Sequence, residues 1–243
     1  MSSTFWNVVN KVISESDVVI EVLDARSPET TRNTEIENKV KAKKKEIIYV
    51  QNKSDLVPLK DKKSLKVGYQ VFVSSTNNLG TTNLRKLLHK LKGDKPFITI
   101  GIVGYPNTGK SSLINVLKQR KSASTSARAG HTKGIQKIKI SKGMYLLDTP
   151  GVYAYKEADE VKLAAINCIS AENVKEPDLV ALEILKEHSR VICDYYKIKK
   201  GKDEEETLEL LTARLNLYKK GKELDIDRAS RTLITDWQRG KIK

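Results

Sequence analysis

The sequence predicts an α/β protein in which a mostly parallel, six-stranded sheet is followed by a smaller all-α domain. Three observations support this fold class. Short apolar, β-branched runs alternate with helical patterns up to about residue 156, as in consecutive βαβ units. Beyond that point apolar residues recur with spacings of three and four, which is typical of amphipathic helices. A chain of 243 residues, 39% of them hydrophobic, can bury a core in each part.

The predicted strands all belong to the first part of the chain. They are residues 17–24, 46–52, 70–75, 97–104, 136–141 and 144–151. The helices expected between the first four strands are 29–44, 56–66 and 81–92. The last two strands are linked by Ser-Lys-Gly, a short turn that suits an antiparallel hairpin. We therefore expect one antiparallel edge strand.

The second part of the chain, residues 157–243, lacks strand patterns. Four segments there have helical apolar spacing, and Pro177 and Asp225 are suitable residues for the start of a helix. The predicted domains are therefore residues 1–156, which contain the sheet, and residues 157–243, which are helical.

The net charge of +15 is the strongest feature of the composition. Residues 1–156 contain 28 Lys and Arg against 12 Asp and Glu, whereas the rest of the chain is nearly balanced. Clusters such as KVKAKKKE and KDKKSLK attract phosphate backbones, so we expect RNA as a partner. The alternative is a lysine-rich surface without a specific partner, but that alternative predicts an even distribution of charge.

Several classes of protein are disfavoured by simple patterns. No apolar run approaches the roughly 20 residues needed to cross a bilayer, so we expect no membrane contact. The first residues do not resemble a signal peptide. Cys168 and Cys193 lack the spacing of a metal site, and buried thiols in a reducing cytoplasm are the expectation.

A phosphate-binding motif lies between a predicted strand and a predicted helix. Residues Gly104 to Ser111 match G-x-x-x-x-G-K-[ST], in which the glycines allow backbone N–H groups to surround phosphates. Lys110 is expected to reach the β- and γ-phosphates, and Ser111 to bind Mg²⁺. The predicted phosphate-binding residues are Asn107, Thr108, Gly109, Lys110, Ser111 and Ser112.

Two further segments are candidates for the metal and the γ-phosphate. Asp148 begins Asp-Thr-Pro-Gly at the end of a predicted strand, where its carboxylate could hold Mg²⁺ and the Gly151 N–H could contact the γ-phosphate. The Ser- and Gly-rich segment 126–136 reads as a loop, and Thr132 within it is the candidate for closing over Mg²⁺. The alternative is that this segment is a solvated connection.

The tetrad Asn52-Lys53-Ser54-Asp55 follows another predicted strand. A carboxylate at Asp55 would accept hydrogen bonds from guanine N1–H and the exocyclic amine, which adenine does not offer. Asn52 would connect this loop to the phosphate loop, and the Lys53 stem would cover the base. Ser74 and Ser75 end the next strand, where the Ser75 N–H could meet guanine O6.

The guanine tetrad precedes the phosphate loop in this chain, the reverse of the order in most GTP-binding proteins. The order is explained if a conventional chain has been joined end to start and cut elsewhere, with the joint at residues 92–97. Ligands bind at the carboxyl ends of parallel strands, whatever the order of connections. We therefore expect all of these loops to converge.

These motifs together resemble the circularly permuted Ras-like P-loop GTPases of ribosome assembly, the YlqF/RbgA type. The matching segments are VLDARSPETTRN, NKSDL, GYPNTGKSSLIN, GHTKG and LLDTPG, in that family's order. The resemblance covers about residues 17–153 and extends less securely to residues 220–242. It implies hydrolysis of GTP to GDP by a protein that binds rRNA in a ribosomal subunit or its precursor, with the large subunit favoured.

The resemblance also bears on catalysis. It implies slow intrinsic turnover raised by the ribosomal particle, with Lys110, Thr132 and Asn107 as the catalytic candidates, and Asn107 helping to hold a K⁺ ion. Val152 stands where many GTPases carry a Gln that orients water. The first 88 residues contain no His, so His131 is the remaining candidate for an assisting histidine.

Two rival functions remain open at this stage. A signalling or membrane-traffic switch would share the nucleotide motifs, but the basic asymmetry disfavours it. An ATP-dependent, kinase-like enzyme would share the phosphate loop, but the two guanine loops oppose it. We expect a cytoplasmic monomer, and the sequence leaves open whether it acts on the large or the small subunit.

Overall fold

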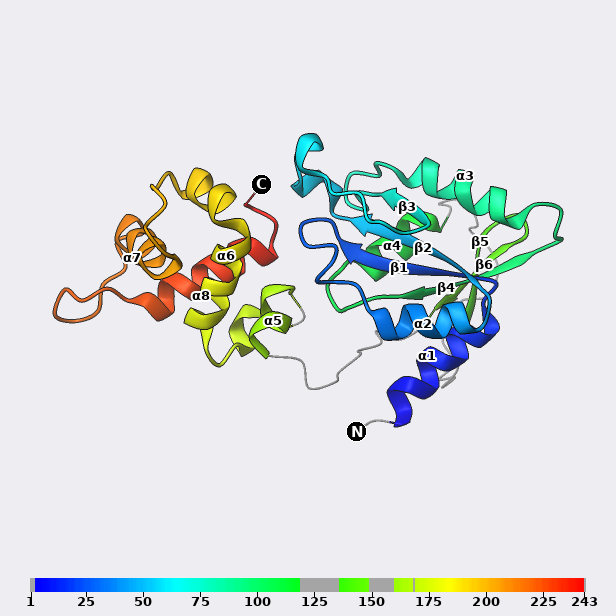
Figure 1. Ribbon diagram of the computed structural model, residues 1–243, viewed down its shortest axis with the longest axis horizontal. Helices are drawn as coiled ribbons and strands as arrows, with labels where there is room; N and C mark the ends of the chain where they lie inside the picture. Colours follow the sequence, from blue (N-terminus) through cyan, green and yellow to red (C-terminus); the bar gives the residue numbers. More distant parts are fainter. Residues whose placement is uncertain (1–2, 119–135, 149–159, 168, 243) are drawn as a thin grey trace. The chain divides into compact units, whose positions relative to one another are not determined.

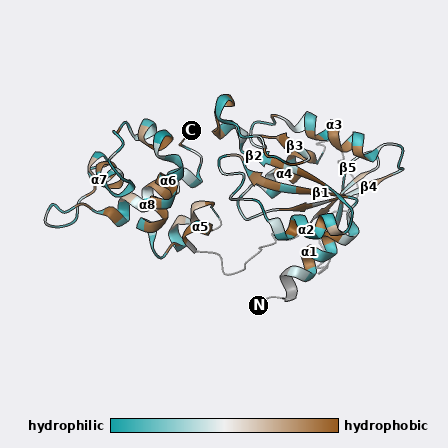
Figure 2. Cartoon of the chain, viewed as in Figure 1, coloured by the Kyte–Doolittle hydropathy of each residue, from teal (hydrophilic) through white to brown (hydrophobic). Residues whose placement is uncertain are grey.

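The computed structural model describes residues 3–118, 136–148, 160–167 and 169–242. The chain divides into two compact units, unit 1 being Met1–Ala154 and unit 2 being Tyr155–Lys243. Each unit has a hydrophobic core of its own (Figures 1 and 2).

Unit 1 contains the predicted six-stranded sheet, with strand order β3-β2-β1-β4-β6-β5. The strands are β1 (Val18–Asp24), β2 (Glu46–Asn52), β3 (Tyr69–Phe72), β4 (Ile98–Val103), β5 (Gln136–Ser141) and β6 (Met144–Asp148). All pairs are parallel except β5 with β6, which is antiparallel. The predicted fold class, including the antiparallel edge strand, is therefore confirmed.

The strand order separates the sheet into two consecutive halves of the chain. Strands β1 to β3 form one half and β4 to β6 the other, and β1 lies beside β4 where the halves meet. Helix α3 (Thr81–Lys92) and residues 93–97 connect the halves. Because β1, β2, β3, β4 and β6 are parallel, their carboxyl ends share one edge of the sheet.

Helices cover both faces of the sheet (Figure 1). Leu84 and Leu88 of α3 share a core with Leu113 of α4 (Lys110–Leu117) and with Ile20 of β1. Val12 of α1 (Ser3–Glu15) shares the opposite core with residues of α2 (Thr34–Ala42), namely Ile36 and Val40. Strands that are buried on both faces are mostly apolar, as β1 and β4 are apart from Glu21, Asp24 and Thr99.

One glycine allows the close packing of α1. A Cβ added at Gly101 of β4 would lie 2.7 Å from Val12 Cγ1 and 3.0 Å from Ser16 Oγ. The sequence pattern had not indicated α1 as an element of the fold. Its apolar residues, Val9, Val12 and Ile13, are fully buried in the structure, and they have the three- and four-residue spacing of a helix that packs on a sheet.

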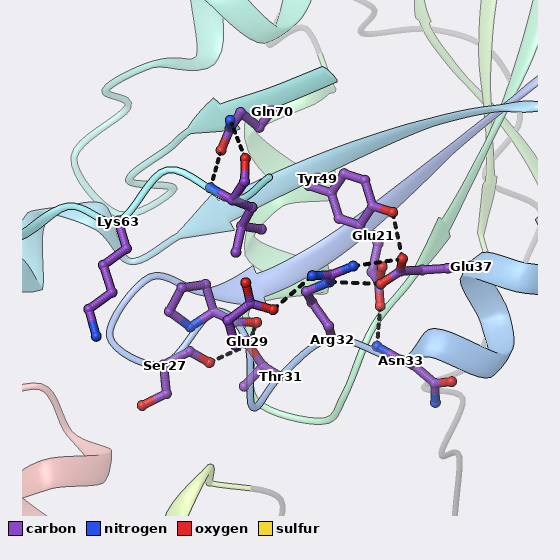
Figure 3. A network of polar contacts seen from close by, with 12 residues as sticks. Glu21, Ser27, Glu29, Thr31, Arg32, Asn33, Glu37, Tyr49, Lys63 and Gln70 are labelled. Atoms are coloured by element: carbon purple, nitrogen blue, oxygen red, sulfur yellow. Dashed lines mark hydrogen bonds and ion pairs between the residues drawn. The ribbon is translucent and has the colours of Figure 1, made fainter. Parts of the chain in front are cut away.

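The predicted helix at 56–66 is wrong. Two short 3₁₀ turns, η1 (Ser54–Leu56) and η2 (Leu59–Asp61), occupy this region instead. Pro58 cannot donate a helical hydrogen bond, and Leu59 is 85% exposed, so no apolar stripe faces the core. The segment is held by the side chain of Gln70, which accepts from Leu65 N–H and donates to Leu65 O (Figure 3).

Unit 2 is helical. Its elements are α5 (Glu160–Ala165), η3 (Ala171–Asn173), α6 (Pro177–Tyr196), α7 (Glu204–Arg214) and α8 (Ile226–Gln238). Pro177 begins α6, and the side chain of Asp225 accepts from Arg228 N–H to cap α8, so both predicted helix starts are confirmed. No helix within the described ranges is long and apolar enough to cross a membrane.

Candidate functional site

The candidate site lies at the edge where the parallel strands of unit 1 end. The phosphate loop leaves β4 at Gly104, whose φ is +142°. A Cβ there would lie 2.5 Å from Val22 O of the neighbouring β1. Glycine therefore allows the loop to start alongside β1 and turn back over the end of the sheet.

The phosphate loop itself is shaped by left-handed residues at its tip. Asn107 has φ +56° and Gly109 has φ +94°. Thr108 is buried, and its hydroxyl donates to Tyr105 O at 2.9 Å, which closes the loop on itself. Helix α4 then begins at Lys110, so its first N–H groups lie at the end of the loop. Such an arrangement is suited to binding an anion.

Asn52 connects three loops through a single side chain. Its Nδ2 donates to Thr108 O of the phosphate loop at 2.9 Å. Its Oδ1 accepts from the Ser75 N–H at 3.1 Å and from the Ser75 hydroxyl at 2.9 Å. All three groups are buried, so these hydrogen bonds are shielded from competing water. The predicted contact between the tetrad and the phosphate loop is thus present.

Gly109 is needed for this contact. A Cβ at that position would lie 2.1 Å from Nδ2 of Asn52. The second glycine of the phosphate motif therefore serves the approach of Asn52 as well as the backbone turn.

Lys53 is held by an ion pair that the sequence reasoning missed. Its Nζ lies 2.9 Å from Oδ2 of Asp24, and the Arg26 guanidinium donates to both carboxylate oxygens of Asp24. Burial alone would raise the pKa of Asp24, but the charges of Arg26 and Lys53 outweigh burial and hold that pKa well below its usual range. The parallel register places Asp24 directly opposite Asn52. The signal for this pair was Asp-Ala-Arg at the end of one strand and Asn-Lys at the end of the next.

Asp55 is the middle residue of the turn η1, which begins directly after Lys53. The backbone of Lys53 is left-handed. The turn is fixed by a hydrogen bond from Ser54 N–H to Val73 O at 3.0 Å. The Asp55 side chain is half-buried, and no hydrogen bond or ion pair to it is formed by the described part of the chain. Its carboxylate therefore remains available at the end of the sheet.

The second guanine loop is compact. Ser74 pairs with Leu79 through reciprocal backbone hydrogen bonds, and its hydroxyl accepts from Asn77 N–H at 3.2 Å. The Ser75 N–H, which we expected to meet guanine O6, donates to Asn52 in this structure. A contact of this N–H with a base would require it to exchange or share that partner, so its role stays a prediction.

Lys110 folds over the phosphate loop. Its Nζ donates to Gly104 O at 2.8 Å and to Tyr105 O at 2.5 Å. Ser111 and Ser112 are exposed at the start of α4. The lysine charge and the serine hydroxyls therefore lie at the same helix end as the first backbone N–H groups of α4.

Several predicted residues fall outside the described part of the structure. They are Thr132, Gly151, Val152 and His131. For Asp148 the backbone is described as the last residue of β6, and its side chain is not. Strand β6 pairs with β4, the strand that precedes the phosphate loop. Asp148 therefore lies at the same edge of the sheet as the phosphate loop.

A buried polar network beside the site was also missed (Figure 3). Glu37 of α2 accepts hydrogen bonds from Arg32 and, at 2.8 Å, from the Tyr49 hydroxyl. Glu21 of β1 is fully buried and accepts from Asn33 N–H at 2.7 Å. Burial raises the pKa of Glu21 to about 8. The network fixes Arg32 and Asn33 in the segment that follows β1, the strand that ends at Asp24.

The chain matches the family described as 50S ribosome-binding GTPase over residues 99–215. It is 40% identical to an uncharacterized GTP-binding protein of Methanocaldococcus jannaschii, with 97% of this chain and 65% of the relative covered. It is 35% identical to nucleolar GTP-binding protein 2 of Saccharomyces cerevisiae, over 99% of this chain and 52% of that protein. The chain thus spans about half to two thirds of these relatives.

Solved structures with a similar fold were also found. The GDP-bound structure of YlqF from T. maritima superposes with a TM-score of 0.64 and 25% identity, covering 96% of this chain and 94% of that one. The GNP-bound structure of YlqF superposes with the same TM-score at 24% identity, and shows the shared fold. With the strand order and the loops that meet through Asn52, these matches show that the chain shares the fold of YlqF and is similar to GTP-binding proteins over nearly its whole length.

Proposed function

We propose that this protein binds GTP and GDP with Mg²⁺, hydrolyses GTP, and acts as an assembly factor on a ribosomal particle. Residues 1–156 form the GTPase domain in this proposal, and residues 157–243 form a helical domain that also contacts the particle. The observation that carries the proposal is the hydrogen bond from Asn52 Nδ2 to Thr108 O at 2.9 Å. It joins the loop that would read the base to the loop that would hold the phosphates.

Selectivity for guanine rests on Asp55. A half-buried carboxylate without a partner among the described residues suits the two donors on one edge of guanine. Adenine would leave the carboxylate unpaired, which costs roughly 1–3 kcal/mol or more for a charged group. The ion pair with Asp24 holds the Lys53 stem beside this turn, where it can cover one face of the base. Ser74 and Ser75 would close the other side of the base pocket.

The phosphates fit the loop from Asn107 to Ser112. The left-handed residues at 107 and 109 and the N-terminus of α4 provide converging N–H groups. Lys110 would exchange its two carbonyl partners for phosphate oxygens. Ser111, Thr132 and Asp148 would hold Mg²⁺, which when bound neutralises phosphate charge, and Gly151 would contact the γ-phosphate.

Hydrolysis is slow in this proposal until the ribosomal particle is bound. Val152 stands where a water-orienting Gln is common, so this chain lacks that aid. Asn107 is exposed at the tip of the phosphate loop, where it can help to hold a K⁺ ion. Such an ion would supply positive charge beside the phosphates.

The proposed partner is rRNA in a large ribosomal subunit or its precursor. The family description names the 50S ribosome, and the yeast relative is named as nucleolar. Residues 1–156 carry the entire excess of basic charge, as an RNA-binding surface requires. We propose a cytoplasmic monomer, consistent with the buried free thiol of Cys193, and a nucleolar site is the alternative.

The test is a competition for nucleotides. Fluorescent GTP should be displaced by GTP and GDP, and not by ATP at equal concentration. The Asp55→Asn variant should lose GTP affinity and gain affinity for xanthine nucleotides, because the new amide matches the xanthine edge. Asp61→Asn, an exposed carboxylate nearby, is the matched control and should bind as the original does. GTP binding that is unchanged by Asp55→Asn would overturn the base assignment.

Binding of the protein to ribosomal particles is tested separately. The protein should sediment with large subunits or their precursors in the presence of a non-hydrolysable GTP analogue, and those particles should raise its GTP turnover. Binding to liposomes in place of ribosomal particles would favour a membrane-traffic switch and contradict this proposal.

A further inference from the structure

An exposed aromatic pair lies where β4 begins. Phe97, just before β4, is 57% exposed, although it is among the largest apolar side chains of unit 1. Its ring lies 6.4 Å from the ring of Tyr145 of β6, at an interplanar angle of 81°. The two rings meet edge to face, and more than half of the Phe97 side chain remains exposed to solvent.

The register of the sheet places lysines on the same face as Tyr145. In the β5–β6 pair, Lys139 lies opposite Tyr145, and Lys137, two residues earlier in β5, lies opposite Leu147. Ile138 and Ile140 between and beside them point into the core under α3 and α4. Lys137 and Lys139 therefore project from the other face, and both are exposed.

The β5–β6 turn brings two further lysines near Phe97 and Tyr145. Gly143 O accepts from Ile98 N–H at 2.8 Å, directly after Phe97. A Cβ at Gly143, where φ is +71°, would lie 2.5 Å from Pro96 O. The turn is therefore packed against residues 96–98. An exposed lysine precedes each of these two segments: Lys142 before Gly143, and Lys95 before Pro96.

The charge of this surface is not neutralised locally. None of Lys95, Lys137, Lys139 and Lys142 forms an ion pair with any residue that the structure describes. Of the nearby acids, Asp17 is engaged by the Thr99 N–H at 2.7 Å, and Asp94 is exposed. We call Lys95, Phe97, Lys137, Lys139, Lys142 and Tyr145 the aromatic–lysine platform.

We propose that the aromatic–lysine platform binds unpaired RNA, with one base stacked on Phe97 and the lysines contacting the flanking phosphates. Exposed aromatic faces bordered by cations are the usual means of holding single-stranded nucleic acid without reading a duplex. A protein partner would be expected to bury aliphatic side chains around the ring, whereas the exposed residues of β5 and its turn to β6 include Lys137, Lys139 and Lys142. The inference deepens the proposed function, on which the choice of RNA rests, by naming where RNA binds.

The platform is separate from the nucleotide site. Phe97 precedes the first residue of β4, whereas Gly104 of the phosphate loop follows its last. A strand of six residues spans about 20 Å at roughly 3.3 Å per residue. A base stacked on Phe97 therefore lies about one strand length from the phosphate loop, whereas Lys137, opposite Leu147, lies nearer to that loop.

The first test measures RNA affinity by fluorescence anisotropy with a labelled 12-nucleotide oligouridine. Phe97→Ala should weaken binding about 5- to 150-fold, the range for loss of one stacked base. Leu59→Ala removes an 85% exposed apolar side chain elsewhere in unit 1 and should leave the affinity unchanged. Equal affinities of Phe97→Ala and the original protein would overturn the platform.

The second test separates charge from stacking. The double variant Lys137→Gln, Lys139→Gln should lower the slope of log Kd against log salt concentration by about 1.4, since each phosphate contact on a single strand contributes about 0.7. Lys199→Gln, Lys200→Gln in unit 2 is the control. In Phe97→Trp, oligouridine should quench the added tryptophan fluorescence and heparin should not. Equal quenching by heparin would show that no base stacks there.

A third measurement distinguishes failure of the platform from failure of the proposed function. GTP affinity and sedimentation with ribosomal particles are measured for the same variants. Intact GTP binding with RNA affinity insensitive to Phe97 would overturn the platform alone. Loss of particle binding by Phe97→Ala with unchanged RNA affinity would mean that the ring contacts a protein, and would also overturn it.

Discussion

The side-chain amide of Asn52 donates to the backbone carbonyl of Thr108 at 2.9 Å, across 56 residues of sequence. The contact is buried, and Oδ1 of the same side chain is satisfied by Ser75. One amide therefore fixes the distance between the base loops and the phosphate loop. Asn52 is the last residue of β2, and Thr108 follows β4. This hydrogen bond therefore links loops from the two halves of the sheet at the candidate site.

Replacing Asn52 by Asp should uncouple the loops. The carboxylate keeps the acceptor for Ser75 but places an oxygen against Thr108 O, where a donor is needed. Loss of one buried hydrogen bond costs about 1–3 kcal/mol, so GDP affinity measured by titration calorimetry should fall about 5- to 150-fold. Asn83→Asp, at an exposed position of α3, is the control. Unchanged GDP affinity in Asn52→Asp would contradict the role given to this contact.

Gly109→Ala should be more damaging than a glycine substitution elsewhere. Both Gly109 and Gly221 have positive φ, +94° and +108°, so both substitutions carry backbone strain of about 1–2 kcal/mol. A Cβ at Gly109 meets Asn52 Nδ2 at 2.1 Å, whereas nothing lies within 4 Å of one at Gly221. Nucleotide affinity and the urea midpoint should therefore fall in Gly109→Ala, and Gly221→Ala should lose only a little stability. Equal behaviour of the two variants would remove the steric argument.

The Asp24 carboxylate should make the protein sensitive to acid. Its pKa is lowered in the folded state, so its contribution is present above its ordinary value of 3.8 and is lost as pH falls below it. Asp24→Asn should remove this dependence and leave Arg26 and Lys53 without their charge partner, at a cost of about 3–5 kcal/mol. Urea unfolding at pH 7 and pH 3 measures both effects. A variant as stable as the original at pH 7 would show that the pair contributes nothing.

Glu21 should lower the stability of the protein as pH rises, in contrast to Asp24, which lowers stability as pH falls. Burial raises its pKa to about 8 from 4.5 in the unfolded chain. Its contribution is complete below pH 4.5 and is lost as pH rises to about 8, at up to about 1.4 kcal/mol per pH unit. Glu21→Gln keeps the acceptor for Asn33 N–H and cannot ionise, so the free energy of unfolding should change less between pH 5 and 8. A variant that keeps the full slope would assign the titration to another group.

GTP turnover should depend on the monovalent cation. If Asn107 helps to hold K⁺ beside the phosphates, turnover in K⁺ should exceed turnover in Na⁺ at equal ionic strength by tenfold or more, about 1.4 kcal/mol of barrier. Asn107→Gly, which tolerates the φ of +56° at this position, should reduce turnover in K⁺ to the level in Na⁺. Identical rates in the two salts would exclude this role.

The local sequence specified the strands and most helices because their signals are local. The apolar runs of β1, β2 and β4 are buried on both faces, and such runs are recognisable without knowledge of their neighbours. Pro177 and Asp225 start helices by their own backbone and side-chain chemistry. The candidate residues of the phosphate and guanine loops could likewise be predicted from the sequence, because each motif occupies a single turn of the chain.

What the local signals could not supply depends on contacts between distant segments. Helix formation at 56–66 failed because Leu59 has no core to face, and helix α1 was missed because its partner surface is the narrow gap opened by Gly101. The ion pair of Asp24 with Lys53 joins the ends of two strands and is created by their parallel register. The buried Glu21 with its raised pKa depends on the helix packed over β1.

The sequence by itself thus predicted which loops would bind phosphate and base, and that their order along the chain is rotated. Only the tertiary structure decided that these loops meet through Asn52 and that Gly109 makes room for it. It also decided that Phe97 and Tyr145 pack together where β4 begins, with Lys139 of β5 opposite Tyr145. The physical reason is that a turn is specified by neighbouring residues, whereas a buried contact is specified by strand order and register.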